Sequence, residues 1–395
     1  ADGRVKLMFA NPWAILGLLL VVRLVMGFQF QAIASMTPAI AVDVGLDFAQ
    51  LGTLVGFYML PGMFIAIPGA ILGSRFKDLT MVLFGLGIMA LGGVIAGLAD
   101  SFFLLALGRL LSGAGAVVQS IFVVKMVADW FDIKSVATAM AILLCGWPVG
   151  AAIALLSLGP IAETWGWQPA MHGTAFGCIF AMAVVGLFYK PPPGDSSGTA
   201  SGTGFHISRQ ELFLVCFAGV LWTVYNLAYF SFLSFGPALL IQKGMDVATA
   251  GGAISLASWA ALPALPLGGY VSDRTGRPGM VLLVCCVLAA AASTALPMLD
   301  YPYVLCAAIG LFAAAPAGVI MGRAIALMSP SRRALGNAIM YTFFYGGMGL
   351  GPGLFGWSAD AADTAAAPLY LGAACLILAV PLYWGLHLMV RARSV

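Results

Sequence analysis

Apolar stretches of about 20 residues recur along the whole of this 395-residue chain. As a helix, a stretch of that length spans a hydrocarbon core of about 30 Å. Only 8% of the residues are charged, against roughly 25% in ordinary soluble domains, so the chain has too few charges for a water-facing surface. The alternation typical of strands in membrane barrels is absent, and helices satisfy their backbone internally. The sequence therefore predicts an all-α membrane protein.

The stretches predict twelve spans and a single orientation. With a cytoplasmic N-terminus, thirteen Lys and Arg residues fall in cytoplasmic segments and only Lys243 falls in an outer loop. This positive-inside bias predicts that both termini are cytoplasmic, in a bacterial inner membrane. The first span has no recognisable cleavage site behind it, so we expect it to stay in the mature protein. The predicted spans are 13–38, 49–72, 79–98, 102–128, 136–159, 170–189, 211–240, 247–271, 279–298, 302–328, 334–357 and 367–390.

The second half of the chain repeats the first at an offset of 199 residues. Pro38 aligns with Pro237, and VGLDFAQLG (44–52) aligns with KGMDVATAG (243–251). Between the halves, KPPPGDSSGTASGTG (190–204) has the composition of a flexible linker. We predict a six-helix bundle over 1–189, a cytoplasmic linker over 190–208 and a second six-helix bundle over 209–395. Parallel repeats of this kind occur in transporters whose substrate site lies near the midplane, between the halves.

A charged turn between spans eight and nine, GGYVSDRTGR (268–277), resembles the G-x-x-x-D-R-x-G-R signature of the major facilitator superfamily. At the offset position, GAILGSRFKD (69–78) keeps the arginine but has Ser74 in place of the aspartate. GRLLSGAGAV (108–117) is similar to the helix-four pattern of that family. The resemblance implies two pseudo-symmetric bundles of six helices and secondary transport by alternating access. In general style it extends to the cyanate and nitrate type and to the oxalate and monocarboxylate type of anion carrier.

The same turn predicts a conformational latch. An aspartate at a helix end can pair with an arginine or cap a neighbouring helix N-terminus, and such contacts can form in one conformation and break in the other. A phosphate-binding loop is the alternative, but the Lys-Ser/Thr that should follow is missing. The resemblance implies a conformational or coupling role for the arginine of helix four. The predicted latch residues are Arg75, Arg109, Gly269, Asp273, Arg274, Gly276 and Arg277.

Four basic residues fall inside predicted spans, namely Arg23, Arg109, Lys125 and Arg323, and no carboxylate falls at a span centre. Buried charge is costly and usually functional, and a site for organic cations would need a buried carboxylate. The pattern therefore favours an anionic substrate. Arg23 lies about 15 Å along the first span, near the midplane. Its alternative role is that of a structural hydrogen-bond hub.

Structural roles also explain the two other basic residues that lie inside predicted spans and outside the helix-four pattern. Lys125 can form a helical pair with Asp129, and Arg323 can extend its side chain to the interface.

The second half places aromatic residues opposite Arg23. Trp222 occupies the offset position of Arg23, and Tyr225, Asn226 and Tyr229 follow at helical spacing. The halves thus predict a pocket with a charged side and an aromatic wall, although simple packing also explains each aromatic residue. The predicted substrate-binding residues are Arg23, Gly27, Phe30, Gln31, Tyr58, Gln119, Lys125, Trp147, Trp222, Tyr225, Asn226, Trp259, Arg323, Tyr341 and Tyr345.

The sequence contains no Ser-His-Asp arrangement, nucleotide-binding loop or cluster of metal-ligand residues. We therefore expect no enzymatic activity, cofactor, metal or nucleic-acid partner, and we expect a monomer in the lipid bilayer to suffice. The predicted function is transport of a small anion, inorganic or carboxylate, by exchange or facilitated movement. The alternatives are an exporter of amphipathic drugs and a membrane sensor that does not transport.

Overall fold

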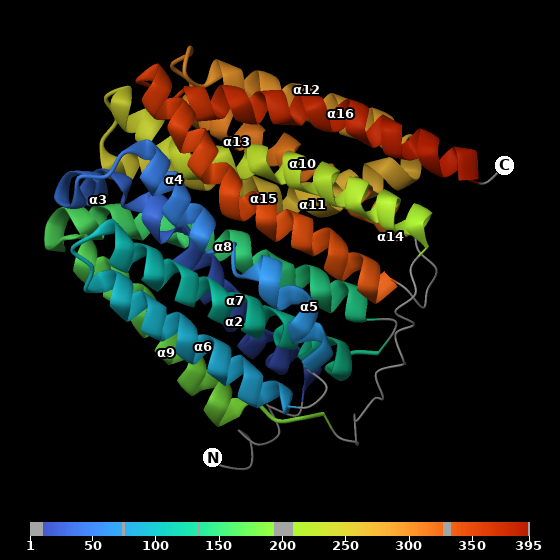
Figure 1. Ribbon diagram of the computed structural model, residues 1–395, viewed down its shortest axis with the longest axis horizontal. Helices are drawn as coiled ribbons and strands as arrows, with labels where there is room; N and C mark the ends of the chain where they lie inside the picture. The colour runs from blue at the N-terminus through green and yellow to red at the C-terminus, as the bar shows by residue number, and fades with distance from the viewer. Residues whose placement is uncertain (1–10, 73–75, 133–134, 193–207, 327–332, 394–395) are drawn as a thin grey trace.

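The computed structural model describes residues 11–72, 76–132, 135–192, 208–326 and 333–393, and every regular element in these residues is a helix. Figure 1 shows the helices of the first half, blue to green, beside those of the second half, yellow to red. The first bundle consists of α2 (Pro12–Ser35), α3 (Thr37–Val44), α4 (Phe48–Phe57), α5 (Gly62–Leu72), α6 (Asp78–Gly97), α7 (Phe102–Trp130), α8 (Val136–Trp165) and α9 (Trp167–Phe188). The second consists of α10 (Arg209–Gln242), α11 (Val247–Thr275), α12 (Pro278–Ala295), α13 (Pro302–Ala314), α14 (Ala317–Ala326), α15 (Arg333–Ala362) and α16 (Ala367–Arg393).

The number of membrane spans follows from these helices. Within the described residues, eleven helical segments are long and apolar enough to cross a membrane, and α4 with α5, like α13 with α14, counts as one segment. The twelfth span is α15, a 30-residue helix that is richer in glycine and tyrosine and therefore less apolar. The prediction of an all-α membrane protein with two six-helix bundles is confirmed. The boundaries 1–189, 190–208 and 209–395 stay a prediction.

Three spans that the sequence predicted as continuous helices are interrupted in the structure. The first is divided at Met36, just before Pro38, and the second is divided between Phe57 and Gly62, around Pro61. The tenth is divided at Ala315 and Pro316. Proline lacks the N–H of a helical hydrogen bond and its ring collides with the preceding turn, which explains each interruption.

The internal repeat is visible in the turn before the second span of each bundle. Gly45 and Gly244 both adopt positive φ angles, 72° and 90°, which a residue without a Cβ atom adopts at little cost. Asp47 and Asp246 then cap α4 and α11, each accepting a hydrogen bond from the backbone N–H three residues on, at 2.7 and 2.9 Å. Hydrogen bonds from the Thr249 side chain and backbone lower the pKa of the Asp246 carboxyl. Both halves therefore start this span with the same turn and cap.

The two bundles meet along two helix pairs that the repeat relates, α4 with α15 and α8 with α11. A Cβ atom at Gly52 of α4 would lie 2.1 Å from the carbonyl oxygen of Pro352. A Cβ atom at Gly251 of α11 would lie 2.2 Å from the carbonyl oxygen of Leu155. At these points the backbones themselves touch, as small residues allow between membrane helices.

We call the end of the molecule at which α3 lies the α3 end, and the end at which α9 stops and α10 starts the linker end (Figure 1). At the α3 end, hydrogen bonds join the bundles. The Asp360 carboxylate of α15 accepts from the backbone N–H groups of Phe48 and Ala49, at 2.9 and 2.8 Å. Gln31 Nε2 of α2 donates to the carbonyl oxygen of Leu233 in α10, at 2.8 Å. The α3 end is therefore closed by polar contacts between the halves.

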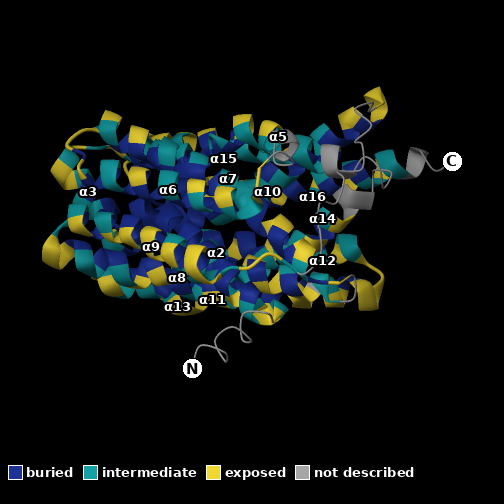
Figure 2. Ribbon diagram, turned by 90° about the horizontal axis from the view of Figure 1, so that it is seen from below, coloured by how far each residue is buried: buried dark blue, intermediate teal, exposed yellow. Residues whose placement is uncertain are grey.

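The outer surface of the bundles carries many large apolar side chains. Phe64, Phe103 and Leu187 are 67%, 77% and 78% exposed. Figure 2 shows exposed residues on the outward faces of the helices and buried residues between them. An exposed apolar surface of this extent fits a protein surrounded by lipid.

Candidate functional site

A cavity of about 280 Å³ lies between the two bundles. It equals the space of about nine liquid waters at roughly 30 Å³ each, which suits a small organic molecule. Residues of α2, α7 and α8 form one side, and residues of α10, α11 and α13 to α15 form the other. The lining residues are Arg23, Met26, Met59, Ser120, Leu144, Trp147, Pro148, Trp222, Tyr225, Asn226, Tyr229, Phe230, Ala261, Leu265, Ala313, Ala314, Ala317, Tyr341, Phe344 and Tyr345.

Arg23 provides the one charged side chain among these lining residues. Its Nη1 donates to the Ser120 hydroxyl of α7 and, at 3.5 Å, to the sulfur of Met26. Its Nε is buried and has no hydrogen-bond partner in the part of the chain that the structure describes. Because no carboxylate lines the cavity, the guanidinium is a positive charge without a counter-ion at this site.

The opposite side of the cavity is an aromatic wall from α10 and α15. Trp222 stacks on Tyr225, with ring centroids 5.8 Å apart and planes at 29°. Phe344 packs edge-on against Tyr341 at 5.9 Å and against Tyr345 at 5.4 Å. Tyr341 and Tyr345 line the same cavity as Arg23. The wall therefore combines flat apolar surfaces with phenol hydroxyl groups.

Three aromatic rings separate the cavity from the α3 end. Phe30, Trp147 and Phe230 form a triangle in which each pair of ring centroids is 5.3 Å apart. A Cβ atom at Gly27 would lie 2.1 Å from the carbonyl oxygen of Trp147, so glycine lets α2 and α8 touch beside this triangle. We refer to the three rings as the aromatic floor. It comes from both bundles, because Phe230 belongs to α10.

The cavity brings together seven of the fifteen predicted binding residues: Arg23, Trp147, Trp222, Tyr225, Asn226, Tyr341 and Tyr345. Sequence reasoning missed Ser120 and Phe344. A signal existed for both, since Ser120 follows Gln119 and Phe344 lies three residues after Tyr341 on a helix face that already held two candidates. Tyr229, which follows Trp222 at helical spacing, also lines the cavity.

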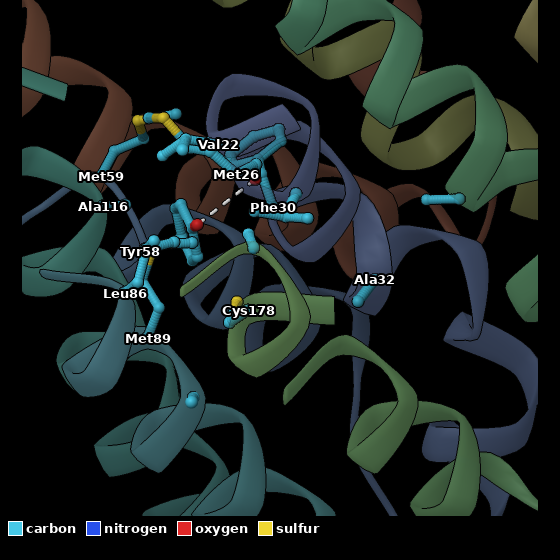
Figure 3. Close-up of a cluster of buried hydrophobic side chains, with 14 of the residues drawn as sticks. Val22, Met26, Phe30, Ala32, Tyr58, Met59, Leu86, Met89, Ala116 and Cys178 are labelled. Atoms are coloured by element: carbon cyan, nitrogen blue, oxygen red, sulfur yellow. Dashed lines mark hydrogen bonds between the residues drawn. The ribbon is translucent and has the colours of Figure 1, made fainter. Parts of the chain in front are cut away.

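Four other predicted binding residues pack behind the cavity without lining it. Phe30 belongs to the aromatic floor, Gly27 forms the contact of α2 with α8, and Gln31 bonds to the second bundle at the α3 end. The Tyr58 hydroxyl donates to the backbone oxygen of Met26 at 3.3 Å, which Figure 3 shows among buried side chains of the first bundle.

Gln119 is also buried behind the cavity. Its Nε2 donates to the sulfur of Met26 at 3.1 Å. It therefore supports the turn of α2 that carries Arg23.

The remaining predicted binding residues lie away from the cavity. Lys125 forms a salt bridge of 2.7 Å with Asp78 of α6, in place of the helical pair with Asp129 that the sequence suggested. Trp259 is 41% exposed and does not line the cavity. The side chain of Arg323 falls outside the described residues.

Arg109 is buried in the first bundle, with an exposed fraction of 1%. Its Nη1 and Nη2 donate to the backbone oxygens of Gln29 and Phe30 at 2.8 and 2.9 Å, and its Nε donates to that of Leu54 at 3.1 Å. The guanidinium carbon lies 4.5 Å from the centre of the Tyr58 ring. Its contacts are thus directed at the backbone of α2 and α4, away from the cavity.

The predicted latch turn lies at the linker end. Gly276 ends α11 with a φ of 63°. Asp273 is exposed and makes no ion pair in the part of the chain that the structure describes. Arg274 is exposed and donates to the Tyr270 hydroxyl on its own helix at 2.6 Å.

Gly269 and Arg277, the other described members of the predicted latch turn, make no hydrogen bond or ion pair between the bundles within the described residues. Gly269 is half-buried on α11, Arg277 is exposed, and Arg75 falls outside the described residues. The role of this turn stays a prediction.

A second hollow of about 440 Å³ lies at the α3 end, beside α3 and α8. It contains two acidic residues, Asp43 and Glu163. The Asp43 carboxylate already accepts hydrogen bonds from Trp167 Nε1 at 2.7 Å and from Gln168 Nε2 at 2.9 Å. The central cavity, with its unpaired cation, is the better candidate for a ligand site.

Known proteins similar to this chain include bacterial carriers. The hexuronate transporter of Bacillus subtilis (strain 168) is 24% identical over 283 residues, which cover 66% of each chain. This chain therefore spans just under two thirds of that relative's length. The 3-(3-hydroxy-phenyl)propionate transporter of Escherichia coli (strain K12) is 24% identical over 278 residues, or 68% of this chain and 67% of the relative.

A solved structure shares the fold. It is a crystal structure of a bacterial homologue of the human lysosomal transporter Spinster, in an inward-facing and occupied conformation. The TM-score is 0.77 and the identity 19%, over 94% of this chain and 95% of the other. A family model, described as the Major Facilitator Superfamily, matches residues 19–299 and 221–394. Because these matches extend over nearly all of the sequence, the chain belongs to the Major Facilitator Superfamily.

Proposed function

We propose that this protein is a secondary transporter that moves a small organic carboxylate across the membrane by alternating access. The observation that carries the proposal is the charge of the central cavity. Among the described residues that line it, Arg23 is the one ionised side chain, and it has no carboxylate to neutralise it. A buried cation without a counter-ion is expensive in a membrane and is stabilised when an anion binds.

The lining of the cavity favours an organic over an inorganic anion. Most of the surface opposite Arg23 consists of rings and short aliphatic side chains, including Phe344 and Leu265. Such a surface stabilises a ligand with an apolar body. The two relatives are named for carrying hexuronate and 3-(3-hydroxy-phenyl)propionate, and both compounds are organic carboxylates. An exporter of cationic drugs is less well supported, because no acidic side chain is among the described lining residues.

The contacts between the bundles support alternating access. The Asp360 contact, the Gln31 contact and the aromatic floor close the α3 end. At the linker end, Asp273 is exposed and unpaired within the described residues. We therefore propose that ligands reach this state of the cavity from the linker end, and that the opposite state opens the α3 end as the bundles 1–189 and 209–395 rock against each other.

The remaining parts of the proposal concern location. The positive-inside bias of the loops supports a bacterial inner membrane, with the linker end and both termini in the cytoplasm. Both sides of the cavity come from the two bundles of this chain, and we propose a monomer as the transporting unit.

The proposal is tested by replacing Arg23 with alanine and measuring carboxylate uptake into proteoliposomes. Loss of two charge-assisted hydrogen bonds to a carboxylate, at about 1.5–3 kcal/mol each, should reduce affinity by at least about 100-fold. Lys125→Gln is the matched control, because it removes a cation that lies outside the cavity. We expect near-normal uptake from that control.

Two results would contradict the proposal. Uptake of carboxylates by the Arg23→Ala variant at the normal rate would remove Arg23 from the site. Purified, folded protein that transports no organic anion from a broad panel would favour the sensor alternative.

A further inference from the structure

The residues that line the cavity also indicate which kind of carboxylate binds there. This inference about the ligand rests on the proposed function. We propose that the ligand is a monocarboxylate with a flat, largely apolar body, and that dicarboxylates are poor ligands. Two features of the described lining support this: Arg23 is its one charged side chain, and the surface opposite Arg23 is an aromatic wall.

One terminal nitrogen of the Arg23 guanidinium remains available to a ligand. Arginine carries five N–H donors in a planar fork. The hydrogen bonds of Arg23 to Ser120 and Met26 both use Nη1. Nε and Nη2 make no hydrogen bond to the described residues, but Nε is covered by neighbouring atoms. Nη2 is therefore the nitrogen left for a ligand, and one guanidinium neutralises one carboxylate.

A second carboxylate has no partner in the described lining. No Lys, His or further Arg is among the described residues that line the cavity. A dianion would therefore bury its second charge against rings and aliphatic side chains. Burying an unpaired charge costs far more than a neutral contact provides. Charge balance at this site favours a monoanion.

The polar groups of the described lining are engaged only in part. The Tyr225 hydroxyl donates to the backbone oxygen of Ala313, and Asn226 Nδ2 donates to that of Trp222 at 2.7 Å. Trp222 Nε1 and the Tyr229 hydroxyl are buried without a hydrogen-bond partner in the described residues, so they can meet a polar substituent on the ligand. The ring faces of Trp222 and Phe344 offer a flat surface to the body of the ligand.

The test compares two acids on the purified protein, by quenching of tryptophan fluorescence and by competition with a labelled acid. The first is 3-phenylpropionate, a flat monoanion. The second is 3-(4-carboxyphenyl)propionate, which adds a second charge to the same skeleton. We expect 3-phenylpropionate to bind at least tenfold more tightly than the dianion, and Arg23→Ala to abolish that binding.

Arg23→Lys separates charge from geometry. It keeps the positive charge but lacks the planar guanidinium, so we expect it to lower affinity for 3-phenylpropionate by about tenfold or more, with the order of the two acids preserved. Binding of the dianion as tight as that of 3-phenylpropionate, and dependent on Arg23, would overturn this inference and leave the proposed function intact. Binding of neither acid in an Arg23-dependent manner would overturn both.

Discussion

Arg109 and Arg23 lie in the same bundle, but the N–H groups of their guanidinium groups differ in how many hydrogen bonds they make. Arg109 directs all three of its nitrogens at backbone oxygens and lies over the Tyr58 ring. Arg23 leaves an edge of its guanidinium unpaired beside the cavity. A buried arginine whose donors are satisfied stabilises the structure, whereas one with free donors is prepared for a ligand. Residue type and position in a span did not distinguish the two, because the distinction lies in their partners.

Replacing Arg109 with leucine should therefore destabilise the protein. The change leaves three buried carbonyl oxygens without their side-chain donor, and a buried polar group without its partner costs about 1–3 kcal/mol. We expect a clear drop in the melting temperature of the detergent-solubilised protein, followed by circular dichroism. Arg109→Lys, which retains a charge and three donors without the planar fork, should lose less. A leucine variant as stable as the wild type would show that these hydrogen bonds contribute little.

At the scale of the helices, the first turn of α4 depends on both bundles. Asp47 of the same chain segment satisfies the third N–H of the helix, and Asp360 of α15 satisfies the first two. Helix N-termini carry unsatisfied N–H groups and a partial positive charge, both of which favour a carboxylate. Separation of α4 from α15 at the α3 end leaves two of these groups without a protein acceptor, so this contact stabilises the closed state.

Asp360→Asn should shift the protein toward the state that is open at the α3 end. The amide oxygen can accept from one N–H, but the amide nitrogen cannot accept from the other, and the negative charge is lost. A loss of about 1–2 kcal/mol changes the ratio of closed to open molecules by about 5- to 30-fold. Spin labels at the exposed positions Val42 and Met298, one on each bundle, would report longer distances, after alanine replaces the seven native cysteines.

Asp363→Asn serves as the control for this shift. Asp363 is an exposed acidic residue close to Asp360, and asparagine also tolerates its positive φ of 51°. An unchanged distance distribution in Asp360→Asn, or an equal shift in both variants, would refute a specific role for the cap.

The sequence predicts elements better than it predicts contacts. Span length and loop charge were enough for the twelve helices, and the offset of 199 paired the segments of Asp47 and Asp246, although their role as helix caps came from the structure. The breaks at Pro61 and Pro316 were missed, because several other prolines, such as Pro148 and Pro237, remain inside helices. Which proline interrupts a helix depends on the packing around it, and a single span does not contain that information.

For the cavity, the sequence predicted residue types on the correct helices but not their depth. Trp222 opposite Arg23 followed from the repeat, and both line the cavity. Trp259 and Lys125 appeared equally plausible, yet Trp259 is 41% exposed and Lys125 pairs with Asp78. Helical spacing indicates which residues share a face, but it does not indicate which face of a helix points to the cavity. That orientation had to come from the structure.

At the scale of the whole molecule, the unpaired charge of Arg23 bears on the proposed transport cycle. In that cycle a bound anion would neutralise the guanidinium, whereas the empty cavity would reorient with a buried charge that lacks a partner in the described lining. Burying such a charge is costly, so we expect the return of the empty carrier to be the slow step. Proton coupling through a carboxylate is not supported by the described lining, which contains none.

We therefore expect exchange to be faster than net uptake. Proteoliposomes preloaded with unlabelled 3-phenylpropionate should take up the labelled acid several-fold faster than empty vesicles. Equal initial rates with and without preloading would contradict this expectation. Stimulation by a pH gradient of a substrate that cannot be protonated, such as a sulfonate analogue, would also contradict it and would indicate a titrating group elsewhere in the chain.

In the proposed cycle, the same guanidinium should make the carrier sensitive to the membrane potential in one half of the cycle only. With a monoanion bound, the cavity would move no net charge, whereas the empty cavity would move the charge of Arg23 through part of the electric field. A potential acts on an elementary charge with up to about 2.3 kcal/mol per 100 mV. We therefore expect an interior-negative potential to favour the empty carrier with its cavity facing inward. Voltage should then leave one-for-one exchange unaffected, slow net entry of the anion and accelerate its net release.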